Sequence, residues 1–192
     1  MEMIAGKGRK AFPVRERAYS LVEFMTVITI VSILLMLAVP GFRAADQHQR
    51  LTAAANDFFA DIHLTRSEAL HRGTRVDMVP ADGTDWARGW VVFVDGNGNQ
   101  VPDAGETLIY MRGPVAEGIS IKAVFTDSSR QYLAYNGTGR TRTNANSQTP
   151  QLGTISFFLE SKIRRIKVNF LGRPRACNPD TDSSCTGSGE PE

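Results

Sequence analysis

The stretch YSLVEFMTVITIVSILLMLAVP, at residues 19–40, is the most apolar part of this 192-residue chain and sets its organisation. About twenty consecutive apolar residues form a helix long enough to cross a bilayer core of about 30 Å. The 18 residues before it carry five basic and two acidic side chains, a bias that keeps such a leader in the cytoplasm. The stretch therefore predicts a single-pass membrane helix with the remainder of the chain outside the cytoplasm.

Glu23 is the one charged residue in this stretch. A carboxylate within a membrane is costly, and by default it marks a function with a partner. Two simpler interpretations compete with that one. In the first, Glu23 reaches the membrane interface of a plain anchor. In the second, the segment is a secretory signal peptide, whose apolar core is normally shorter, at about 7–15 residues.

The residues around this glutamate, AYSLVE at 18–23, resemble the processing site of type IV pilins and type II secretion pseudopilins. The resemblance implies that a prepilin peptidase cleaves between Ala18 and Tyr19 and that the new N-terminus is methylated. The family usually has Gly where this chain has Ala18. In the family, the carboxylate that corresponds to Glu23 pairs with the N-terminal amine of a neighbouring subunit, and each group gains a partner that lipid does not provide. The resemblance thus predicts three partners: other pilin subunits, the peptidase and the inner membrane.

Beyond this stretch, the hydrophobic period predicts a second, amphipathic half of the helix and then a β-rich domain, an α+β fold. Apolar and small side chains recur every three or four positions in the second half. They are Leu51, Ala55, Phe58, Ile62, Thr65 and Ala69. Short period-two segments between turn residues follow, and they predict an antiparallel β-sandwich-like domain on which the helix packs. The expected division is leader 1–18, transmembrane and assembly helix 19–40, amphipathic helix 41–73, β-rich domain 74–176 and tail 177–192.

Charge and cysteines single out the end of the chain. Residues 128–176 hold nine basic residues and one acidic residue, whereas the tail holds four acidic residues and no basic one. A basic block of this size favours a polyanion partner, although a solvated strand surface has the same composition. Cys177 and Cys185 are the only cysteines, and outside the cytoplasm they are expected to form a disulfide.

Two further stretches resemble the GspH/FimT group of minor pilins and pseudopilins. They are residues 65–76, at the predicted end of the helix and the first strand, and residues 86–99, around a buried-looking strand. The resemblance implies a globular domain displayed in or at the tip of a filament, facing the periplasm before assembly. It implies neither an enzymatic activity nor a cofactor.

Within that group two functions compete, and a short motif separates them. FimT-like minor pilins of type IV pili include DNA-binding proteins that act in natural transformation, whereas GspH-like pseudopilins have a structural role in type II secretion. The DNA binders carry Gly-Arg-x-Arg at the end of the last strand, and this chain has GRPR at residues 172–175. Guanidinium groups grip phosphate oxygens bidentately, and Gly172 shapes a turn that presents Arg173 and Arg175.

The preceding residues, RIKVNF at 165–170, extend this prediction. Strand alternation places Arg165 and Lys167 on the exposed face and buries Ile166, Val168 and Phe170. Such a surface reads charge and not sequence, so the expected ligand is double-stranded DNA, bound non-specifically and more weakly as salt rises. The motif also occurs as GRTR at 139–142, either as a second basic loop or by coincidence. A membrane-anchored adhesin or sensor that never polymerises is the remaining alternative.

A glycine- and asparagine-rich stretch at residues 95–106 is a weak candidate for calcium binding. Oxygen-bearing side chains occupy positions 1, 3, 5, 9 and 12 of a calcium loop, namely Asp95, Asn97, Asn99, Asp103 and Glu106. Position 6, which needs Gly in that loop, is Gln100, and a predicted strand precedes the stretch. A hairpin turn with side chains bonded to local backbone is the favoured interpretation, and no metal is predicted.

Overall fold

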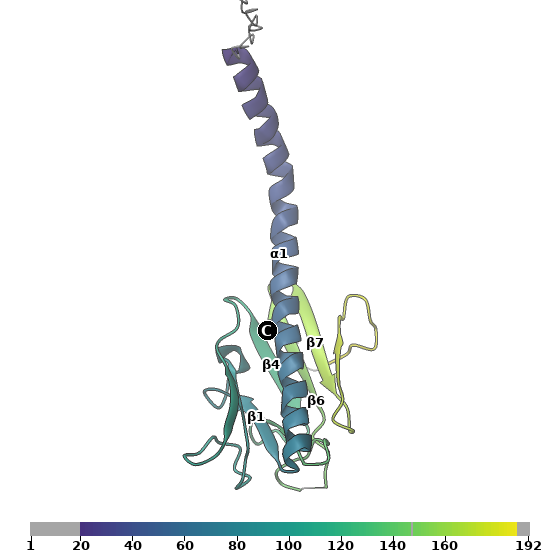
Figure 1. Ribbon diagram of the computed structural model, residues 1–192. Helices are drawn as coiled ribbons and strands as arrows, with labels where there is room; N and C mark the ends of the chain where they lie inside the picture. Colours follow the sequence, from purple (N-terminus) through teal and green to yellow (C-terminus); the bar gives the residue numbers. More distant parts are fainter. Residues whose placement is uncertain (1–19, 147, 188–192) are drawn as a thin grey trace, which may run out of the picture. The chain divides into compact units, whose positions relative to one another are not determined.

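The computed structural model describes residues 20–146 and 148–187, which form one helix followed by two four-stranded antiparallel sheets (Figure 1). The expected α+β class is confirmed. The chain divides into two compact units, residues 1–43 and 44–192. The leader and the expected cleavage site between Ala18 and Tyr19 lie outside the described residues.

Helix α1 runs from Leu21 to Arg72 and begins with a capping box. The Ser20 hydroxyl accepts a hydrogen bond from the Glu23 backbone N–H at 3.2 Å, as expected for Ser at an N-cap with Glu three residues later. In the first unit the large apolar side chains between Leu21 and Met36 are exposed. Among the described residues, no helix is long and apolar enough to cross a membrane. Tyr19 and the side chains of 37–40, which belong to the predicted span, lie outside that description.

Within the second unit, the predicted apolar face of α1 forms the centre of the core. Every member of that face is buried, and the Phe58 side chain is fully enclosed. Its ring packs edge-on against Trp86 and Trp90 from the first sheet region and Phe157 from the second, with centroid separations of 5.1, 4.7 and 5.5 Å. Burying a side chain of this size contributes about 1.5–3 kcal/mol, so α1 joins both sheets into one core. Gly73, at φ 66°, ends the helix.

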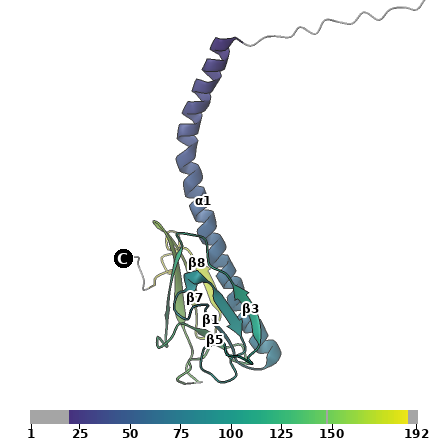
Figure 2. The same ribbon diagram turned by 90° about the vertical axis from the view of Figure 1, so that its left-hand side faces the viewer.

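The first sheet, sheet A, has the strand order β3-β2-β1-β5. Its strands are β1 (Val76–Pro80), β2 (Trp90–Phe93), β3 (Leu108–Arg112) and β5 (Leu133–Tyr135). The short 3₁₀ helix η1 (Trp86–Arg88) precedes β2 and places Trp86 in the core. β3 is the edge strand beside α1, and Arg112 at its end bonds to Asp61 of the helix (Figure 2).

The second sheet, sheet B, has the order β4-β6-β7-β8. Its strands are β4 (Ser120–Phe125), β6 (Gly153–Leu159), β7 (Lys162–Val168) and β8 (Pro174–Cys177). The inner face packs in the core and includes Ile155, Phe157 and Ile166, whereas the alternate positions of the same strands point to the outer face. β8 is the one strand for which no segment was predicted, because four residues that begin with Pro and include Arg lack the apolar alternation of a strand.

Candidate nucleic-acid interface on the outer face of sheet B

The turn between β7 and β8 explains the glycine of the GRPR motif. Gly172 has φ 74°, and an added Cβ would lie 2.9 Å from both the Thr141 nitrogen and the Tyr135 ring. The buried Tyr135 hydroxyl donates a hydrogen bond to the Gly172 carbonyl at 2.7 Å. Asn169 closes the turn by accepting hydrogen bonds from the backbone N–H groups of Leu171 and Arg173, each at 3.0 Å. Gly172 is therefore a structural residue that orients the two arginines after it.

Three basic side chains line one groove at this end of sheet B. Lys167 and Arg175 are direct cross-strand partners on β7 and β8, and Arg173 precedes them in the turn. The groove has a volume of about 520 Å³, and Val124 and Leu152 provide its apolar wall. Arg173 is exposed, and within the described part of the chain its side chain forms no hydrogen bond or ion pair. The geometry offers one open guanidinium and two further cations to an anionic ligand.

Arg165 does not share this exposed surface, contrary to the prediction. It is buried at 6% exposure, and its guanidinium donates hydrogen bonds to the Ser156 hydroxyl at 3.2 Å and the Cys185 carbonyl at 2.8 Å. Alternation assigns the correct face of β7, but the returning C-terminal segment covers that position. Phe170 was also predicted wrongly, because β7 ends at Val168 and places Phe170 in the turn, where it is 60% exposed. Ile166 and Val168 are buried as expected.

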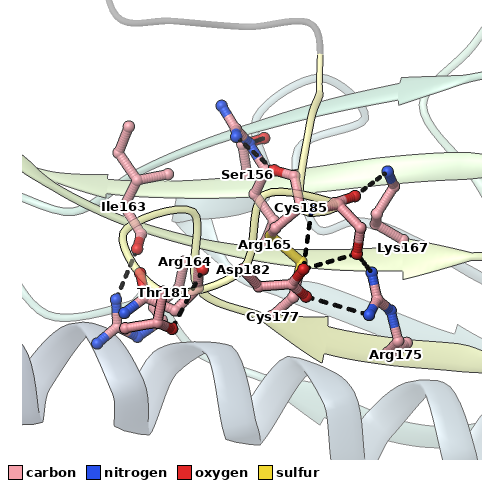
Figure 3. Close-up of a disulfide and its surroundings, with 12 residues drawn as sticks. Ser156, Ile163, Arg164, Arg165, Lys167, Arg175, Cys177, Thr181, Asp182 and Cys185 are labelled. Carbon is pink, nitrogen blue, oxygen red and sulfur yellow. Dashed lines mark hydrogen bonds and ion pairs between the residues drawn. A yellow bond between two sulfur atoms is a disulfide. The ribbon is translucent and has the colours of Figure 1, made fainter.

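The disulfide that the sequence predicts is present and closes a short ordered loop (Figure 3). Cys177 ends β8, and Cys185 is buried. Between them, the Asn178 carbonyl accepts a hydrogen bond from the Asp182 N–H at 2.9 Å, and the Asp182 carbonyl accepts one from the Cys185 N–H at 2.9 Å. The expectation that residues after 177 are disordered apart from the tether is wrong for 178–187, which pack on the sheet.

This loop also supplies acceptors to the basic strands. Arg175 donates to the Asp182 carboxylate at 3.1 Å and to the Ser184 hydroxyl at 3.0 Å, and Lys167 donates to the Ser184 carbonyl at 3.2 Å (Figure 3). Hydrogen bonds from Ser184, followed by the charge of Arg175, hold the pKa of the Asp182 carboxyl below its usual value. Two of the three groove cations therefore already have an internal partner, whereas Arg173 has none among the described residues.

The second copy of the motif lies next to the first in space. The loop at 139–142 packs against the GRPR turn, where the space beside Gly172 is closed by Thr141 and by the Gly139 carbonyl. Arg140 is exposed, and Arg142 bonds only to the Thr141 carbonyl. The sequence left open whether this copy is a second basic loop or a coincidence, and the structure places it beside the groove.

The calcium candidate forms a self-satisfied turn. Asp95 is buried and accepts backbone N–H groups from Gly98, Asn99 and Gln100. Asp103 accepts from the side-chain amides of Asn97 and Asn99, and Glu106 accepts the N–H groups of Gly96 and Asp103. Across the residues that the structure describes, no group of three or more His, Cys, Asp or Glu side chains is arranged to hold a metal ion.

Comparison with known proteins decides the family. The family described as "Type II transport protein GspH" matches residues 54–172, well over half of the chain. The chain belongs to the GspH family. No curated protein matches it in sequence.

Two solved structures share the fold of this GspH-family chain. The type IV minor pilin FimU of Pseudomonas aeruginosa is 17% identical, with a TM-score of 0.56, and the alignment covers 72% of this chain and 97% of FimU. The minor pseudopilin EpsH of the type 2 secretion system of Vibrio cholerae is 14% identical, with a TM-score of 0.50 and coverage of 68% and 98%. At these identities the likeness shows the fold alone, which is that of minor pilins and pseudopilins. The names printed for the family and for both structures describe transport and pilus proteins, not enzymes.

Proposed function

We propose that this GspH-family protein is a minor pilin of a type IV pilus that binds DNA without sequence preference. Arg173 and Arg175 are the principal contacts, Lys167 supports them, and Gly172 shapes the turn. The observation that carries the proposal is the basic groove, because cations from β7, β8 and the turn between them converge on one open surface. Arg165 is left out of the proposed contacts because it is buried.

The chemistry of the groove favours the phosphate backbone over base edges. Arginine presents several N–H donors in a planar fork that matches the oxygen pairs of a phosphate. Contacts of this kind position a duplex but carry no sequence information, and each phosphate neutralised releases counterions. Affinity for duplex DNA is therefore expected to fall steeply with salt and to vary little with sequence.

We further propose that residues 19–40 anchor the protein in the inner membrane with the domain in the periplasm and later serve as its assembly helix. Cleavage between Ala18 and Tyr19 would leave Glu23 as the fifth mature residue, ready to pair with the N-terminal amine of a neighbouring pilin. The apolar run and the position of Glu23 support this proposal. Residues 41–73 would then continue the helix into the domain of 74–176, and residues 177–192 would form the tail.

The DNA proposal is tested with the full chain in mild detergent, by measuring affinity for a mixed-sequence duplex at several salt concentrations. The Arg173→Ala/Arg175→Ala variant should bind at least about tenfold more weakly, and its salt slope should fall by about two, since two phosphate contacts are lost. The matched control is Arg88→Ala/Arg130→Ala, which removes the same charge from two exposed positions outside the groove. No affinity in the folded wild type, or equal weakening in both variants, would remove the groove as a DNA site.

A structural role in a type II secretion machine is the second candidate, and the family match favours it. Residues 54–172 match a family described by type II transport, and EpsH shares the fold. In that role, the basic groove would face a protein neighbour. A deletion strain separates the two functions: loss of DNA uptake with normal protein secretion supports the pilus, and the reverse supports the secretion machine.

A further inference from the structure

The C-terminal segment at residues 178–187, called the tail below, lies on the outer face of sheet B. Cys185 is 2% exposed, although it follows a loop of polar residues. A Cβ added at Gly187 would lie 2.8 Å from the Thr154 methyl group and 3.1 Å from the Arg165 side chain. The tail is thus seated against β6 and β7, and glycine is the residue that fits at its end.

The tail presents oxygen atoms to the basic residues in the manner of an anionic ligand. Asp182 and Ser184 supply a carboxylate and a hydroxyl to Arg175, and the Ser184 carbonyl accepts from Lys167. Asp182 is itself oriented by Ser184, whose N–H and hydroxyl both donate to the first carboxylate oxygen, at 2.9 and 2.6 Å. That arrangement leaves the second carboxylate oxygen for Arg175, where a phosphate oxygen of a bound polyanion would otherwise lie (Figure 3).

Two features make this contact exchangeable. The side chains of Arg175 and Asp182 are 53% and 32% exposed, so water screens their attraction and can replace either partner. The disulfide to Cys177 ends the strand that carries Arg175, and this tether keeps the carboxylate close to the guanidinium at a high effective concentration. A weak contact is thereby maintained without being permanent.

Arg173 lies outside this arrangement, which gives an incoming ligand a place to start. Its side chain has no partner within the described residues, and it shares the groove with Lys167 and Arg175. A polyanion that first contacts Arg173 brings its next phosphates to the positions held by the tail.

We propose that the tail is a built-in competitor for the groove, in which Asp182 and Ser184 occupy the Arg175–Lys167 end until a polyanion displaces them. This inference rests on the proposed function of the groove as a polyanion site. It predicts that removing the charge of Asp182 strengthens binding. If the tail served instead to brace Arg175 for binding, the same change would weaken it.

The test compares Asp182→Asn with Asp180→Asn in the full chain. Both variants remove one negative charge from the same loop, but only Asp182 contacts Arg175, since no side-chain contact involves the exposed Asp180. The probes are a mixed-sequence DNA duplex and inorganic polyphosphate, measured at one fixed salt concentration. Asp182→Asn should bind both probes about two- to fivefold more tightly than wild type, the size expected when one exposed ion pair ceases to compete. Asp180→Asn should show a smaller change.

Hydrogen exchange provides a second measurement that is independent of any ligand. The Ser184 and Cys185 amides, which bond to Asp182, should exchange faster in Asp182→Asn than in wild type, and polyphosphate should produce the same change in wild type. Thermal unfolding confirms that each variant is folded.

The outcomes separate the two proposals. Binding by Asp182→Asn that is no tighter than by Asp180→Asn, or weaker than by wild type, overturns the inference. If DNA binds no variant but polyphosphate binds Asp182→Asn more tightly than Asp180→Asn, the competing tail stands and the DNA function fails. If neither probe binds any folded variant, both proposals fail.

Discussion

Two arginine–carboxylate clusters in this domain have the same chemistry and opposite settings. On β3, Arg112 lies 2.6 Å from the Asp61 carboxylate, whose side chain is 6% exposed. On β8, Arg175 lies 3.1 Å from Asp182, and both of those side chains reach solvent. A buried carboxylate that loses its partner keeps an uncompensated charge, whereas an exposed one is rehydrated. Burial therefore makes the first cluster part of the fold and leaves the second free to exchange partners.

The β3 cluster holds the helix against the edge of sheet A. Asp61 also accepts a hydrogen bond from the Trp90 indole at 2.8 Å, and Asp57, one turn earlier, lies 3.2 Å from Arg112. The Arg112 guanidinium is over the rings of Trp90 and Tyr110, at 5.7 and 5.4 Å from their centroids. The hydrogen bond to Asp61 is the main cause that raises the pKa of Arg112, so this side chain stays charged at any physiological pH.

The largest expected effect comes from breaking the buried cluster. Asp61→Ala should lower the free energy of unfolding by about 3–5 kcal/mol, because Arg112 and the Trp90 N–H lose their acceptor in a buried setting. Asp57→Ala is the matched control: it removes a carboxylate from the same arginine at a 55% exposed position, and should cost less than about 1 kcal/mol. Equal costs in urea unfolding would contradict the distinction between buried and exposed pairs.

A pH dependence of about the same size is expected from a second buried site. The Arg75 guanidinium faces two buried carboxylates, Asp77 at 2.7 Å and Asp95 at 3.6 Å. Because one positive charge faces two buried acids, burial raises the pKa of Asp77 to about 7, although the Arg75 hydrogen bonds act in the opposite direction.

The sign follows from the raised pKa. The folded state holds the Asp77 proton more tightly than the unfolded state, so this stabilisation is complete below about pH 4 and is lost as the pH rises through about 7. The difference in unfolding free energy between wild type and Asp77→Asn should change by up to about 1.4 kcal/mol per pH unit in that window. Chemical unfolding from pH 4 to 8 measures it, and a pH-independent difference would show that Asp77 is ionised throughout.

A smaller effect is expected at the turn that orients the groove arginines. Gly172→Ala should cost about 1–3 kcal/mol, because alanine is strained at φ 74° and its Cβ would press on Thr141 and Tyr135. Gly113→Ala is the control, since it has no positive φ and no atom within 4 Å of an added Cβ. Thermal unfolding distinguishes the two. A cost at Gly172 no larger than at Gly113 would mean that the turn rearranges freely.

The smallest effect on stability should come from the exposed cluster. Arg175→Ala should change the free energy of unfolding by no more than about 0.5 kcal/mol, the range of ordinary surface substitutions. Its effect on polyanion binding should be large by comparison. A stability loss close to that of Asp61→Ala would show that the tail is part of the fold and not an exchangeable competitor.

The sequence predicted the elements well where local pattern decides them. The helix face from Leu51 to Ala69 is buried as its period indicates, and the disulfide forms as its context indicates. The alternation of β7 places Ile166 in the core. These predictions hold because the hydrophobic period and the redox setting act on each segment directly.

The prediction failed where a distant segment decides exposure. Arg165 occupies the outward position that alternation assigns to it, but the tail returns through the disulfide and buries it. Nothing in the residues around Arg165 signals this cover, and a polar, acidic tail has the composition of a disordered segment. Phe170 was misassigned for a local reason, because β7 ends two residues earlier, at Val168, than its alternation implies.

By itself, the sequence determined the order of helix and strands, the buried face of the helix, the cysteine pair and the pilin-like N-terminal motif. Only the tertiary structure decided which cations remain open. Arg173 is free in the described part of the chain, Lys167 and Arg175 are shared with the tail, and Arg165 is enclosed. The physical reason is that residue type and spacing set the local conformation, whereas solvent access depends on contacts between segments that the sequence separates.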